Sequence, residues 1–395
     1  MKILRVINSM DPAIGGPCQG IRNIIPQLTA MGITNEVVSL DDPGQAFINN
    51  DPFVIHAIGK GKGPWSHNNK LETWLSDNIC NYDIVIVHGL WQYYGYAVQK
   101  AFKQIKRKDT RVPALLVMPH GMLDPYFQKA KGRKLKAIRN WFYWKWIEGR
   151  LINRSDALLF TCEEELRLAR TAFTPYQPSK ELNVGYGIQA PPPDSADARE
   201  VFMQKCFGRN DVEYLLFISR IHEKKGVDIL INAYLKLSAT NKNLPKLVIA
   251  GPGLDTNYGK AMKQLAAQSG DIYFPGMLTG HFKWGAFYGA EAFVLISHQE
   301  NFGIAVAEAM ACSKPVLISD KVNIWREISD GGGGLVETDD YQGALALLTQ
   351  WSEMDQSQKE NMGRRAKNIY RQFFGIEGAA ETMKKTLLNI QQSTN

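Results

Sequence analysis

The chain has 395 residues, a length that favours two domains of roughly 150 to 200 residues each. A hydrophobic fraction of 45% and a mean hydropathy of -0.25 are typical of a globular protein. No run approaches the ~18 apolar residues of a membrane-spanning helix. The net charge of +7 favours an anionic partner, although no recognised module supports nucleic-acid binding. The five scattered cysteines contain no CxxC pair, which excludes a disulfide framework and the usual cysteine zinc site.

Short apolar runs alternate with longer helical patterns, which is typical of parallel sheets covered by helices. The first run begins at the N-terminus and reads as a strand, so we expect no secretory signal and a cytoplasmic protein. Six strands are predicted in the first half, at residues 3–7, 36–40, 54–58, 83–87, 114–118 and 157–161. Five are predicted in the second half, at residues 214–219, 246–250, 272–274, 292–297 and 315–319.

A proline-rich segment at 189–194 separates the two series of strands. Because proline lacks an amide donor and favours extended backbone, we expect a linker there. The fold class predicted is therefore α/β, with two Rossmann-like parallel-sheet domains, residues 1–190 and 191–374, facing a central cleft. Ligands of such sheets bind beyond the carboxyl ends of the strands, so functional residues are expected in the loops that follow them.

Three loops of the first half carry candidate residues. Gly16 belongs to a glycine pair after the first strand, where it either lets a ligand approach the backbone or simply forms a turn. His88 and His120 follow two consecutive strands, and two histidines facing one cleft point to function more than a lone histidine does. Three aromatic residues after His88 offer faces on which a sugar ring can stack; they are Trp91, Tyr93 and Tyr94.

A basic stretch at 129–139 runs directly into the aromatic cluster Trp141-Phe-Tyr-Trp-Lys-Trp146. Cations that meet anionic headgroups, followed by aromatics at the interface, are typical of a membrane-surface element. A solvated basic face followed by aromatics packed in the core explains the same pattern. Both interpretations stay open, and the first places the protein at the inner face of the plasma membrane.

The loop after the first strand of the second half contains Arg220 and Lys225. Arginine offers a planar fork of donors and lysine a mobile point charge, so together they suit a diphosphate and its departure. Lys224 is a second candidate, and the alternative is a basic loop that neutralises a helix terminus. Glycines after the next strand, Gly251 and Gly253, permit close approach of a ligand or form a plain turn.

The most informative stretch runs from His298 to Met310 and places Glu300 and Glu308 eight positions apart. Between them lie Asn301, Phe302, Gly303 and Ile304, and the amides from Phe302 to Ile304 are expected to open a helix. A helix start presents unpaired N–H groups and a positive dipole end, which hold anions such as phosphate. A carboxylate further in can accept hydrogen bonds from a ribose diol. Two chance glutamates in an ordinary helix are the alternative.

This Glu-x7-Glu arrangement resembles the donor-site signature of retaining glycosyltransferases of family 4, which have the GT-B fold. The resemblance covers nearly the whole chain, and the His-Gly-Met-Leu segment at 120–123 resembles a bacterial exopolysaccharide-building branch. It implies that a C-terminal helix at about 375–395 packs back on the first domain, which binds the acceptor, while the second binds the nucleotide sugar. The family's Asn-Gly-Ile/Val-Asp segment is replaced here by Tyr186-Gly-Ile-Gln189, which leaves any contact from that segment in doubt.

The resemblance implies roles for the candidate residues. Arg220 and Lys225 would stabilise the departing diphosphate, Glu300 and His120 would orient the donor sugar, and Glu308 would bind the ribose. Gly16, Gly251, Gly253 and the backbone near Met277 would line the nucleotide pocket. The donor, a UDP- or GDP-sugar with UDP favoured, is a substrate, and no cofactor is expected. No Asp-x-Asp motif is present, so metal-independent action is expected.

The predicted function is transfer of a sugar from a nucleotide diphospho-sugar to a saccharide or lipid-linked saccharide in exopolysaccharide biosynthesis. Two alternatives remain: a nucleotide-sugar epimerase of the same fold, and a non-catalytic nucleotide-sugar-binding component of a polysaccharide assembly complex. A dinucleotide-dependent oxidoreductase is disfavoured, because no Gly-x-Gly-x-x-Gly follows a strand with an acidic residue about twenty positions on.

Overall fold

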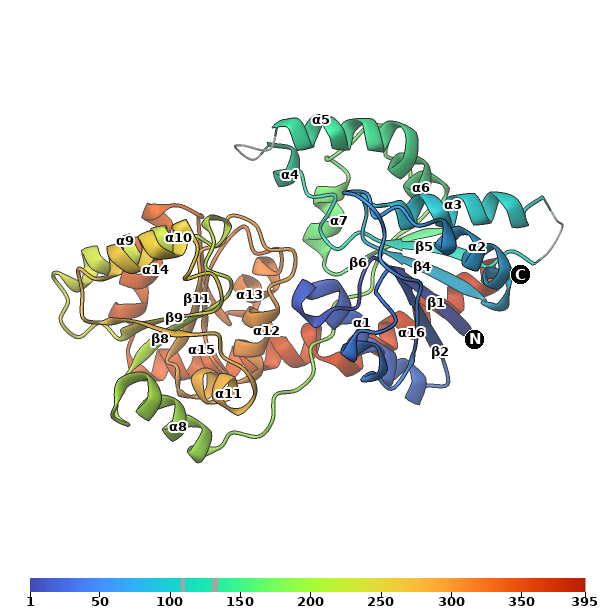
Figure 1. Ribbon diagram of the computed structural model, residues 1–395. Coiled ribbons are helices and arrows are strands. Elements are labelled where there is room, and N and C mark those ends of the chain that lie inside the picture. The colour runs from blue at the N-terminus through green and yellow to red at the C-terminus, as the bar shows by residue number, and fades with distance from the viewer. Residues whose placement is uncertain (108–110, 130–133, 395) are drawn as a thin grey trace. The chain divides into compact units, whose positions relative to one another are not determined.

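The computed structural model describes residues 1–107, 111–129 and 134–394 (Figure 1). The chain divides into two compact units. Met1–Gly187 and Ile376–Asn395 form the N-terminal unit, and Ile188–Gly375 form the C-terminal unit. The boundaries therefore fall at 187/188 and 375/376, where the sequence-based boundaries are 190/191 and 374/375. Among the helices of the described residues, none combines the length and apolar character needed to cross a bilayer.

The N-terminal unit is built on a seven-stranded parallel sheet with the order β3-β2-β1-β4-β5-β6-β7. Its strands are β1 (Lys2–Ile7), β2 (Thr34–Ser39), β3 (Val54–Ala57), β4 (Ile84–His88), β5 (Ala114–Met118), β6 (Ala157–Phe160) and β7 (Glu181–Asn183). The six predicted strands are confirmed within two residues at each end. Strand β7 was not predicted, because its three residues contain a single apolar side chain.

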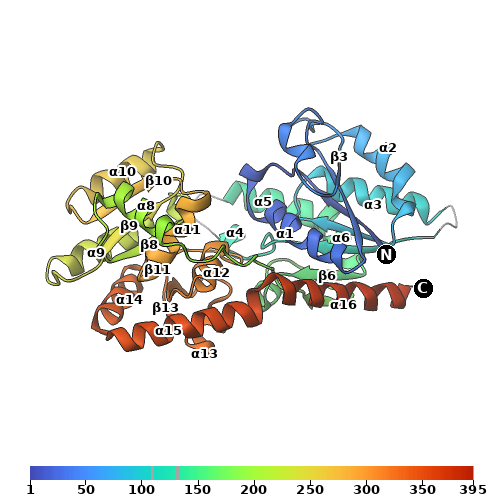
Figure 2. The ribbon, with the colours of Figure 1, turned by 90° about the horizontal axis from the view of Figure 1, so that it is seen from below.

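Helices cover both faces of this sheet. One face packs against α1 (Gly16–Ala30) and α16 (Ile376–Thr394), which lie side by side in Figure 2. The other face packs against α2 (Asn69–Asn78), α3 (Tyr93–Ile105), α6 (Gly149–Arg154) and α7 (Glu163–Ala169). Period-two alternation divides the strands between the two cores: Ile3 faces the first and Leu4 the second. The remaining helices are α4 (Tyr126–Lys129), α5 (Lys134–Tyr143) and a π-helix, η4 (Trp144–Glu148), with short 3-10 turns η1 (Pro12–Ile14), η2 (Ala46–Asn49) and η3 (Ile79–Asn81).

The C-terminal unit is built on a six-stranded parallel sheet with the order β10-β9-β8-β11-β12-β13. Its strands are β8 (Tyr214–Ile218), β9 (Lys246–Ala250), β10 (Ile272–Gly276), β11 (Ala292–Leu295), β12 (Val316–Ser319) and β13 (Gly334–Glu337). The five predicted strands are confirmed within two residues at each end. Strand β13 was missed because it follows a run of glycines and all four of its residues are only half-buried.

The helices of the C-terminal unit are α8 (Ala196–Phe207), α9 (Val227–Ser238), α10 (Asn257–Ala266), α11 (Gly280–Gly289), α12 (Ile304–Ala311), α13 (Trp325–Gly331), α14 (Tyr341–Glu353) and α15 (Gln356–Ile369), with the 3-10 turn η5 (Glu223–Lys225) and the π-helix η6 (Tyr370–Phe374). Helix α8 packs on α11, and α14 packs on α9. The two Rossmann-like parallel sheets predicted from the sequence are confirmed. In each sheet the strand order reverses beside the first strand, at β1/β4 and at β8/β11. Such switch points are where ligands of open α/β sheets bind.

Candidate functional site

Backbone hydrogen bonds tie together the loops at the carboxyl edge of the C-terminal sheet. The amide of Gly251, after β9, donates to the carbonyl of Gly276 at the end of β10 (2.9 Å). The amide of Ile221, after β8, donates to the carbonyl of Pro252 (2.8 Å). The amide of His298, after β11, donates to the carbonyl of Lys224 (2.9 Å). The loops that follow β8, β9, β10 and β11 therefore form one continuous platform.

Two predicted catalytic residues meet on this platform. The ammonium of Lys225, 7% exposed, forms an ion pair with Oε2 of Glu300, which is 25% exposed. Arg220 lies in the same β8 loop, is exposed, and forms no ion pair with another residue of the described chain. Burial limits the screening of the Lys225–Glu300 pair by solvent, while the guanidinium of Arg220 stays available to an anion.

The conformation of the β8 loop places Lys225 beside Glu300. Nδ1 of His222 accepts a hydrogen bond from the amide of Lys224 (3.0 Å) and so caps η5. His222, for which the sequence suggested no role, therefore has a structural role as the cap of this turn. Gly226 ends η5 in the left-handed conformation at φ 63°, where a Cβ would run into the carbonyl oxygen of Ile296. The turn fixes Lys225 in its buried position beside Glu300.

Glu308 lies inside α12 and is paired with a lysine that the sequence analysis did not identify. Nζ of Lys283, on α11, lies 2.6 Å from Oε1 of Glu308. Burial raises the pKa of Glu308, and the Lys283 ammonium opposes that rise. Oε2 of Glu308 makes no hydrogen bond within the described part of the chain. One carboxylate oxygen is thus anchored, and the other can accept a ligand hydroxyl.

The helix start between the two glutamates lies where the sequence predicted it. Gly303 is the N-cap of α12 at φ 83°, and Ile304 is the first helical residue. No side chain caps this terminus, so its first amides can meet an anion. Phe302 is buried and packs edge-on against Phe374, with the ring centroids 5.4 Å apart, so it contributes backbone rather than side chain. Asn301 is half-buried in the loop before it.

The remaining predicted positions of this unit are also at the carboxyl edge. Gly251 adopts φ 140°, and a Cβ there would run into the carbonyl oxygen of Ser219. Gly253 adopts φ 111°, and a Cβ there would run into the carbonyl oxygen of Ile221. Both glycines are therefore required for the β8 and β9 loops to approach each other. Met277, directly after β10, is 69% exposed, although the sequence suggested only its backbone as a contact.

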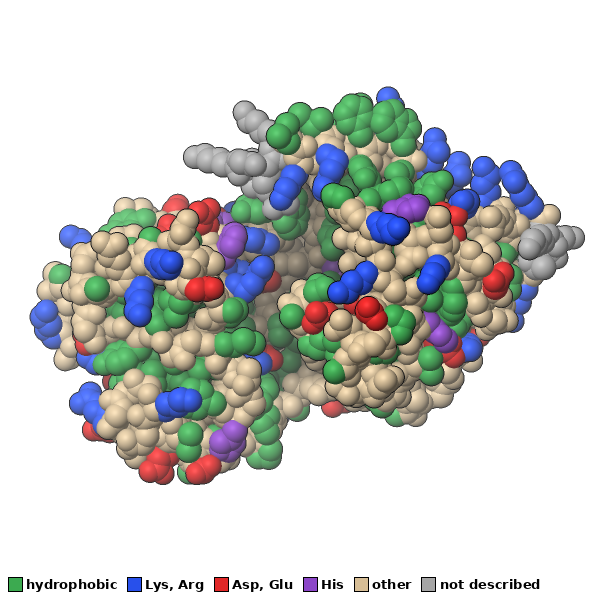
Figure 3. Space-filling model, in the orientation of Figure 1, with side chains coloured by type: hydrophobic (Ala, Val, Ile, Leu, Met, Phe, Trp, Pro, Cys, Tyr) green, Lys and Arg blue, Asp and Glu red, His purple; other side chains and the backbone are tan. Residues whose placement is uncertain are grey.

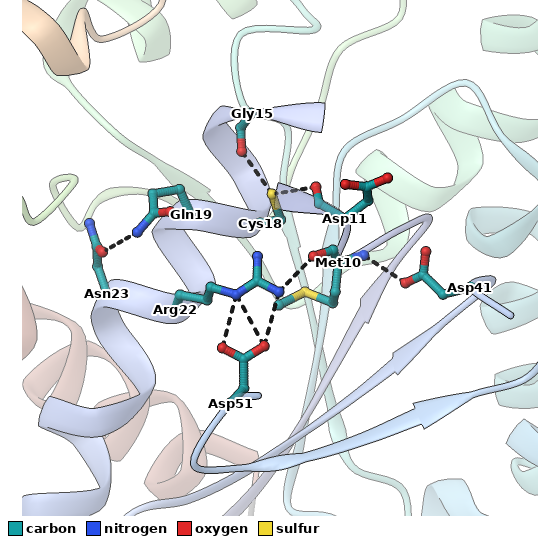
Figure 4. Close-up of polar contacts among 9 residues, drawn as sticks. All are labelled: Met10, Asp11, Gly15, Cys18, Gln19, Arg22, Asn23, Asp41 and Asp51. Atoms are coloured by element: carbon teal, nitrogen blue, oxygen red, sulfur yellow. Dashed lines mark hydrogen bonds and ion pairs between the residues drawn. The ribbon is translucent and has the colours of Figure 1, made fainter. Parts of the chain in front are cut away.

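In the N-terminal unit, the loop that carries Gly16 is held by polar contacts that are at least partly buried (Figure 4). Arg22 on α1 forms a bidentate ion pair with Asp51 and also donates a hydrogen bond to the carbonyl of Met10 (2.7 Å). Asp41 accepts a hydrogen bond from the amide of Met10 (2.7 Å). Gly16 opens α1, and its carbonyl accepts a hydrogen bond from the Tyr186 hydroxyl (2.7 Å). The β1–α1 loop is thus fixed by side chains from three other segments.

The two histidines of this unit are in direct contact. Nδ1 of His88, the last residue of β4, lies 2.9 Å from Nε2 of His120, which follows β5. Nε2 of His88 lies 3.1 Å from Nη1 of Arg5, a buried residue in the middle of β1. Burial lowers the pKa of His120 to about 3, and the Arg5 charge adds to this effect. Burial followed by the charges of Arg5 and His120 lowers the pKa of His88 well below its usual value. Both rings are therefore neutral at physiological pH.

The backbone around His120 is strained and clamped. His120 itself has φ 53°, a left-handed conformation that is uncommon outside glycine and often marks functional positions. The buried carboxylate of Glu165 accepts hydrogen bonds from the amide of the next residue, Gly121 (2.5 Å), and from the amide of Thr161 (2.8 Å). This buried carboxylate ties the His120 loop to the end of β6.

The predicted sugar-stacking surface near His88 is wrong for two of its three aromatics. Tyr93 and Tyr94 are buried at the start of α3, where their hydroxyls contact Glu72 and the carbonyl of His88, respectively. On α3 they share a buried helix face with small residues such as Ala97 and Ala101, which places them in the core. Trp91 is half-buried against Phe173, with ring centroids 5.3 Å apart.

Where the structure describes the basic and aromatic stretch, most of its large apolar side chains are exposed. Residues 130–133 and the side chains of Lys129 and Lys134 lie outside the described residues. Of the aromatics, Trp144 is buried, whereas Trp141 and Trp146 are each 51% exposed and Phe142 is 44% exposed. Upstream on α5, Leu135 is 84% exposed. Core packing therefore explains Trp144 and partly explains Tyr143, which is half-buried against Trp65, whereas Trp141, Phe142 and Trp146 face solvent.

Several residues near the candidate site were missed by the sequence analysis. Arg5 had a detectable signal, because it is a charged residue flanked on both sides by apolar residues of β1. Glu165 and Lys283 had none, since the partner of each is distant in sequence. Within the described ranges, no group of three or more His, Cys, Asp or Glu side chains is arranged to hold a metal ion.

Comparisons with known proteins match both halves of the chain. Residues 199–369 match the family model described as "Glycosyl transferases group 1", and residues 15–180 match the "Glycosyl transferase 4-like domain". Over 358 residues, the chain is 26% identical to a GDP-mannose:cellobiosyl-diphosphopolyprenol alpha-mannosyltransferase of Xanthomonas oryzae pv. oryzae, covering 88% of this chain and 86% of the relative. It is 30% identical over 169 residues to a phosphatidyl-myo-inositol mannosyltransferase of Mycolicibacterium smegmatis, 42% of each chain.

Solved structures share the fold over the full length. Anabaena Alr3699/HepE in complex with UDP and glucose superposes with a TM-score of 0.73 at 18% identity, covering 98% of this chain and 100% of that one. A glycosyltransferase from Rickettsia africae superposes with a TM-score of 0.75 at 16% identity, covering 98% of each chain. At these identities the likeness concerns the architecture of the two sheets.

Proposed function

We propose that this chain, both halves of which match glycosyltransferase family models, is a family 4-type glycosyltransferase with the GT-B fold. It transfers a sugar, with retention of anomeric configuration, from a UDP- or GDP-sugar to a saccharide or lipid-linked saccharide. The C-terminal unit holds the nucleotide sugar, and the N-terminal unit binds the acceptor. No metal takes part. The pathway served is the synthesis of an exopolysaccharide.

The observation that carries this proposal is the pair of Lys–Glu contacts formed by the two glutamates of the Glu-x7-Glu stretch. Glu300 is held by Lys225 and Glu308 by Lys283, and the uncapped start of α12 lies between the two glutamates in the chain. A diphosphate needs cations and free amides, and a ribose needs a carboxylate oxygen. All of these are supplied by loops at the carboxyl edge of one sheet.

In the proposed reaction, the bond between the anomeric carbon and the β-phosphate oxygen breaks as the acceptor oxygen bonds to the same face of that carbon. The acceptor proton passes to the departing phosphate oxygen. Arg220, Lys225 and the amides from Phe302 to Ile304 stabilise the charge that develops on the diphosphate. Glu300 and His120 orient hydroxyl groups of the donor sugar, so catalysis depends on positioning and charge stabilisation.

The donor is identified by screening UDP- and GDP-sugars for thermal stabilisation of the full chain. A matching ligand at 100 times its dissociation constant stabilises the folded state by about 2.7 kcal/mol. A chain that no nucleotide sugar stabilises would contradict the proposal. Donor consumption without any acceptor would indicate an epimerase, and binding without turnover across a broad acceptor panel would indicate a non-catalytic component.

We further propose that the exposed apolar face of α5 and η4 contacts the surface of an anionic membrane, where a lipid-linked acceptor resides. Figure 3 shows hydrophobic side chains gathered over α5, with lysine and arginine side chains nearby. Nζ of Lys145 lies 5.3 Å from the ring centroid of Trp141 and 5.7 Å from that of Trp146. Interleaved cations and aromatics suit the headgroup region of a bilayer.

A basic groove adjoins this face and supports anionic lipid as the partner. The groove has a volume of ≈ 920 Å³, and Trp146 is one of its lining residues. Five cations that form no ion pair within the described chain also line it: Lys103, Lys106, Arg107, Arg150 and Arg154. Asp156 lines the groove as well, so its positive charge is in excess rather than unopposed. A concavity with such an excess fits the phosphates of lipid headgroups.

Vesicle sedimentation tests the membrane contact. We expect the full chain to bind vesicles that contain phosphatidylglycerol and to bind pure phosphatidylcholine weakly. Trp141→Ser/Trp146→Ser should lower the affinity by about tenfold per tryptophan, because each loses the insertion of an aromatic side chain. Val54→Ser/Leu388→Ser removes exposed apolar side chains elsewhere in the same unit and should leave binding unchanged. Equal losses in both variants, or equal binding to both lipids, would contradict the proposal.

A further inference from the structure

Arg5 is a buried cation without a carboxylate partner in the described chain. Its side chain is 1% exposed; Nε donates to Oδ1 of Asn35 (3.0 Å), and Nη1 donates to Nε2 of His88 (3.1 Å). Nη2 has no hydrogen-bond partner among the described residues. Burial lowers the pKa of Arg5 to about 10, so the guanidinium stays charged at neutral pH. A buried, uncompensated charge is costly, and its retention in a strand calls for a functional reason.

The contact with Arg5 determines the protonation of both histidines. A guanidinium has donors only, so Nε2 of His88 must be the acceptor and carries no hydrogen. The ring of His88 then bears its proton on Nδ1 and donates it to Nε2 of His120 (2.9 Å). Because Nε2 of His120 is in turn an acceptor, the proton of that ring is on Nδ1. The two hydrogen bonds therefore point the same way: Arg5 donates to His88, and His88 donates to His120.

The N–H that results is available to a ligand. Nδ1 of His120 makes no hydrogen bond to any other described residue. Arg5 itself cannot reach a substrate through the cavity that it lines with His88 and His120, since that cavity measures only ≈ 20 Å³. Any influence of Arg5 on a reaction must therefore pass through the two rings.

We infer that Arg5 and His88 are positioning residues, which fix His120 as a neutral ring that donates from Nδ1 to a hydroxyl of the bound sugar. The inference rests on the proposed role of His120 in glycosyl transfer and adds the direction of its hydrogen bond. A substrate hydroxyl at this position acts as an acceptor, so a donor sugar with an acceptor-only substituent there, such as fluorine, keeps part of the interaction.

The test reads the ring protons directly. Long-range ¹H–¹⁵N correlation spectra of the histidine-labelled full chain at pH 7 distinguish a protonated from a bare ring nitrogen, whether or not a substrate is known. We expect His88 and His120 both to be neutral, with the proton on Nδ1. A proton on Nε2 of either ring, or a charged His120, would overturn the inference. Because this reading needs no activity, its failure is separate from failure of the proposed reaction.

Two variants of His88 with side chains of similar length distinguish a hydrogen-bonding role of this residue from a packing role. The amide of His88→Gln keeps one acceptor for Arg5 and one donor for His120, whereas His88→Met keeps neither. We expect the Gln variant to retain the Nδ1–H form of His120 and a kcat within about threefold of the wild type. In the Met variant we expect that form to be lost, with kcat about tenfold lower and KM nearly unchanged. Equal effects of Gln and Met on kcat and on the His120 spectrum would show a merely structural role.

Discussion

The two sheets carry polar residues on or just after equivalent strands of the same topology, but the charges of these residues have opposite environments. In the C-terminal unit, the loops beside β8 and β11 pair cations with carboxylates, and Lys225–Glu300 is partly open to solvent. In the N-terminal unit, the equivalent strands β1 and β4 carry Arg5 and His88, a buried cation beside a neutral ring. The first arrangement suits an anion that arrives and leaves, whereas the second maintains a fixed hydrogen-bond donor. If the proposed roles hold, one topology serves both the binding of a departing anion and the fixed positioning of a hydrogen-bond donor.

The largest expected effect concerns the exposed cation of the C-terminal unit. Arg220→Ala should lower kcat/KM by about 10²–10³-fold, the scale of losing a preorganised donor to a developing charge. Steady-state kinetics with the identified donor measures this. Lys236→Ala, which removes an exposed cation about three turns along α9, is the matched control and should be neutral. Unchanged turnover in folded Arg220→Ala would remove this residue from the mechanism.

A smaller effect is expected at the ribose. Glu308→Ala should weaken binding of the nucleoside diphosphate by about 10–100-fold, since hydrogen bonds to a charged group contribute about 1.5–3 kcal/mol. Calorimetry should also show that the wild type prefers the ribonucleotide over its 2′,3′-dideoxy form and that the variant does not. If Glu308→Ala still discriminates between the two, the carboxylate does not bind the diol.

The smallest effect concerns a buried carboxyl of the N-terminal unit. Glu148 accepts a hydrogen bond from the amide of Trp91 (2.9 Å), and burial raises its pKa to about 8. Between pH 4.5 and 8 the folded state then holds a proton that the unfolded state has lost. The free energy of unfolding should fall with rising pH in this window by at most about 1.4 kcal/mol per pH unit.

Glu148→Gln keeps the acceptor for Trp91 and should flatten that slope. Urea denaturation of both proteins at several pH values between 4.5 and 8 measures the difference. A slope as steep in Glu148→Gln as in the wild type would show that another group binds the proton. Together, the three predictions test whether the C-terminal unit binds an anion through exposed charges while the N-terminal unit keeps its buried Glu148 carboxyl neutral.

The architecture was largely predictable because apolar runs and their spacing determine a parallel sheet. The strands missed were those with little apolar content, β7 and β13. Motif residues were likewise placed after strand ends, since Arg220 and Glu300 lie in the loops that follow the apolar strands β8 and β11. What the sequence could not supply was pairing across long separations: Lys283 lies 25 residues from Glu308, and Arg5 lies 83 residues from His88. The burial of Tyr93 and Tyr94 was also missed, because a stacking surface and a core helix face have the same composition.

The most direct test of the account is calorimetric titration of the full chain with UDP, GDP and the corresponding monophosphates. If Arg220, Lys225 and the start of α12 bind the diphosphate group, the nucleoside diphosphate of the donor's base should bind at least about tenfold more tightly than the monophosphate of the same base. This preference should disappear in Arg220→Ala/Lys225→Ala. Equal affinity for both nucleotides in the wild type, or a preference that survives in the double variant, would contradict the account.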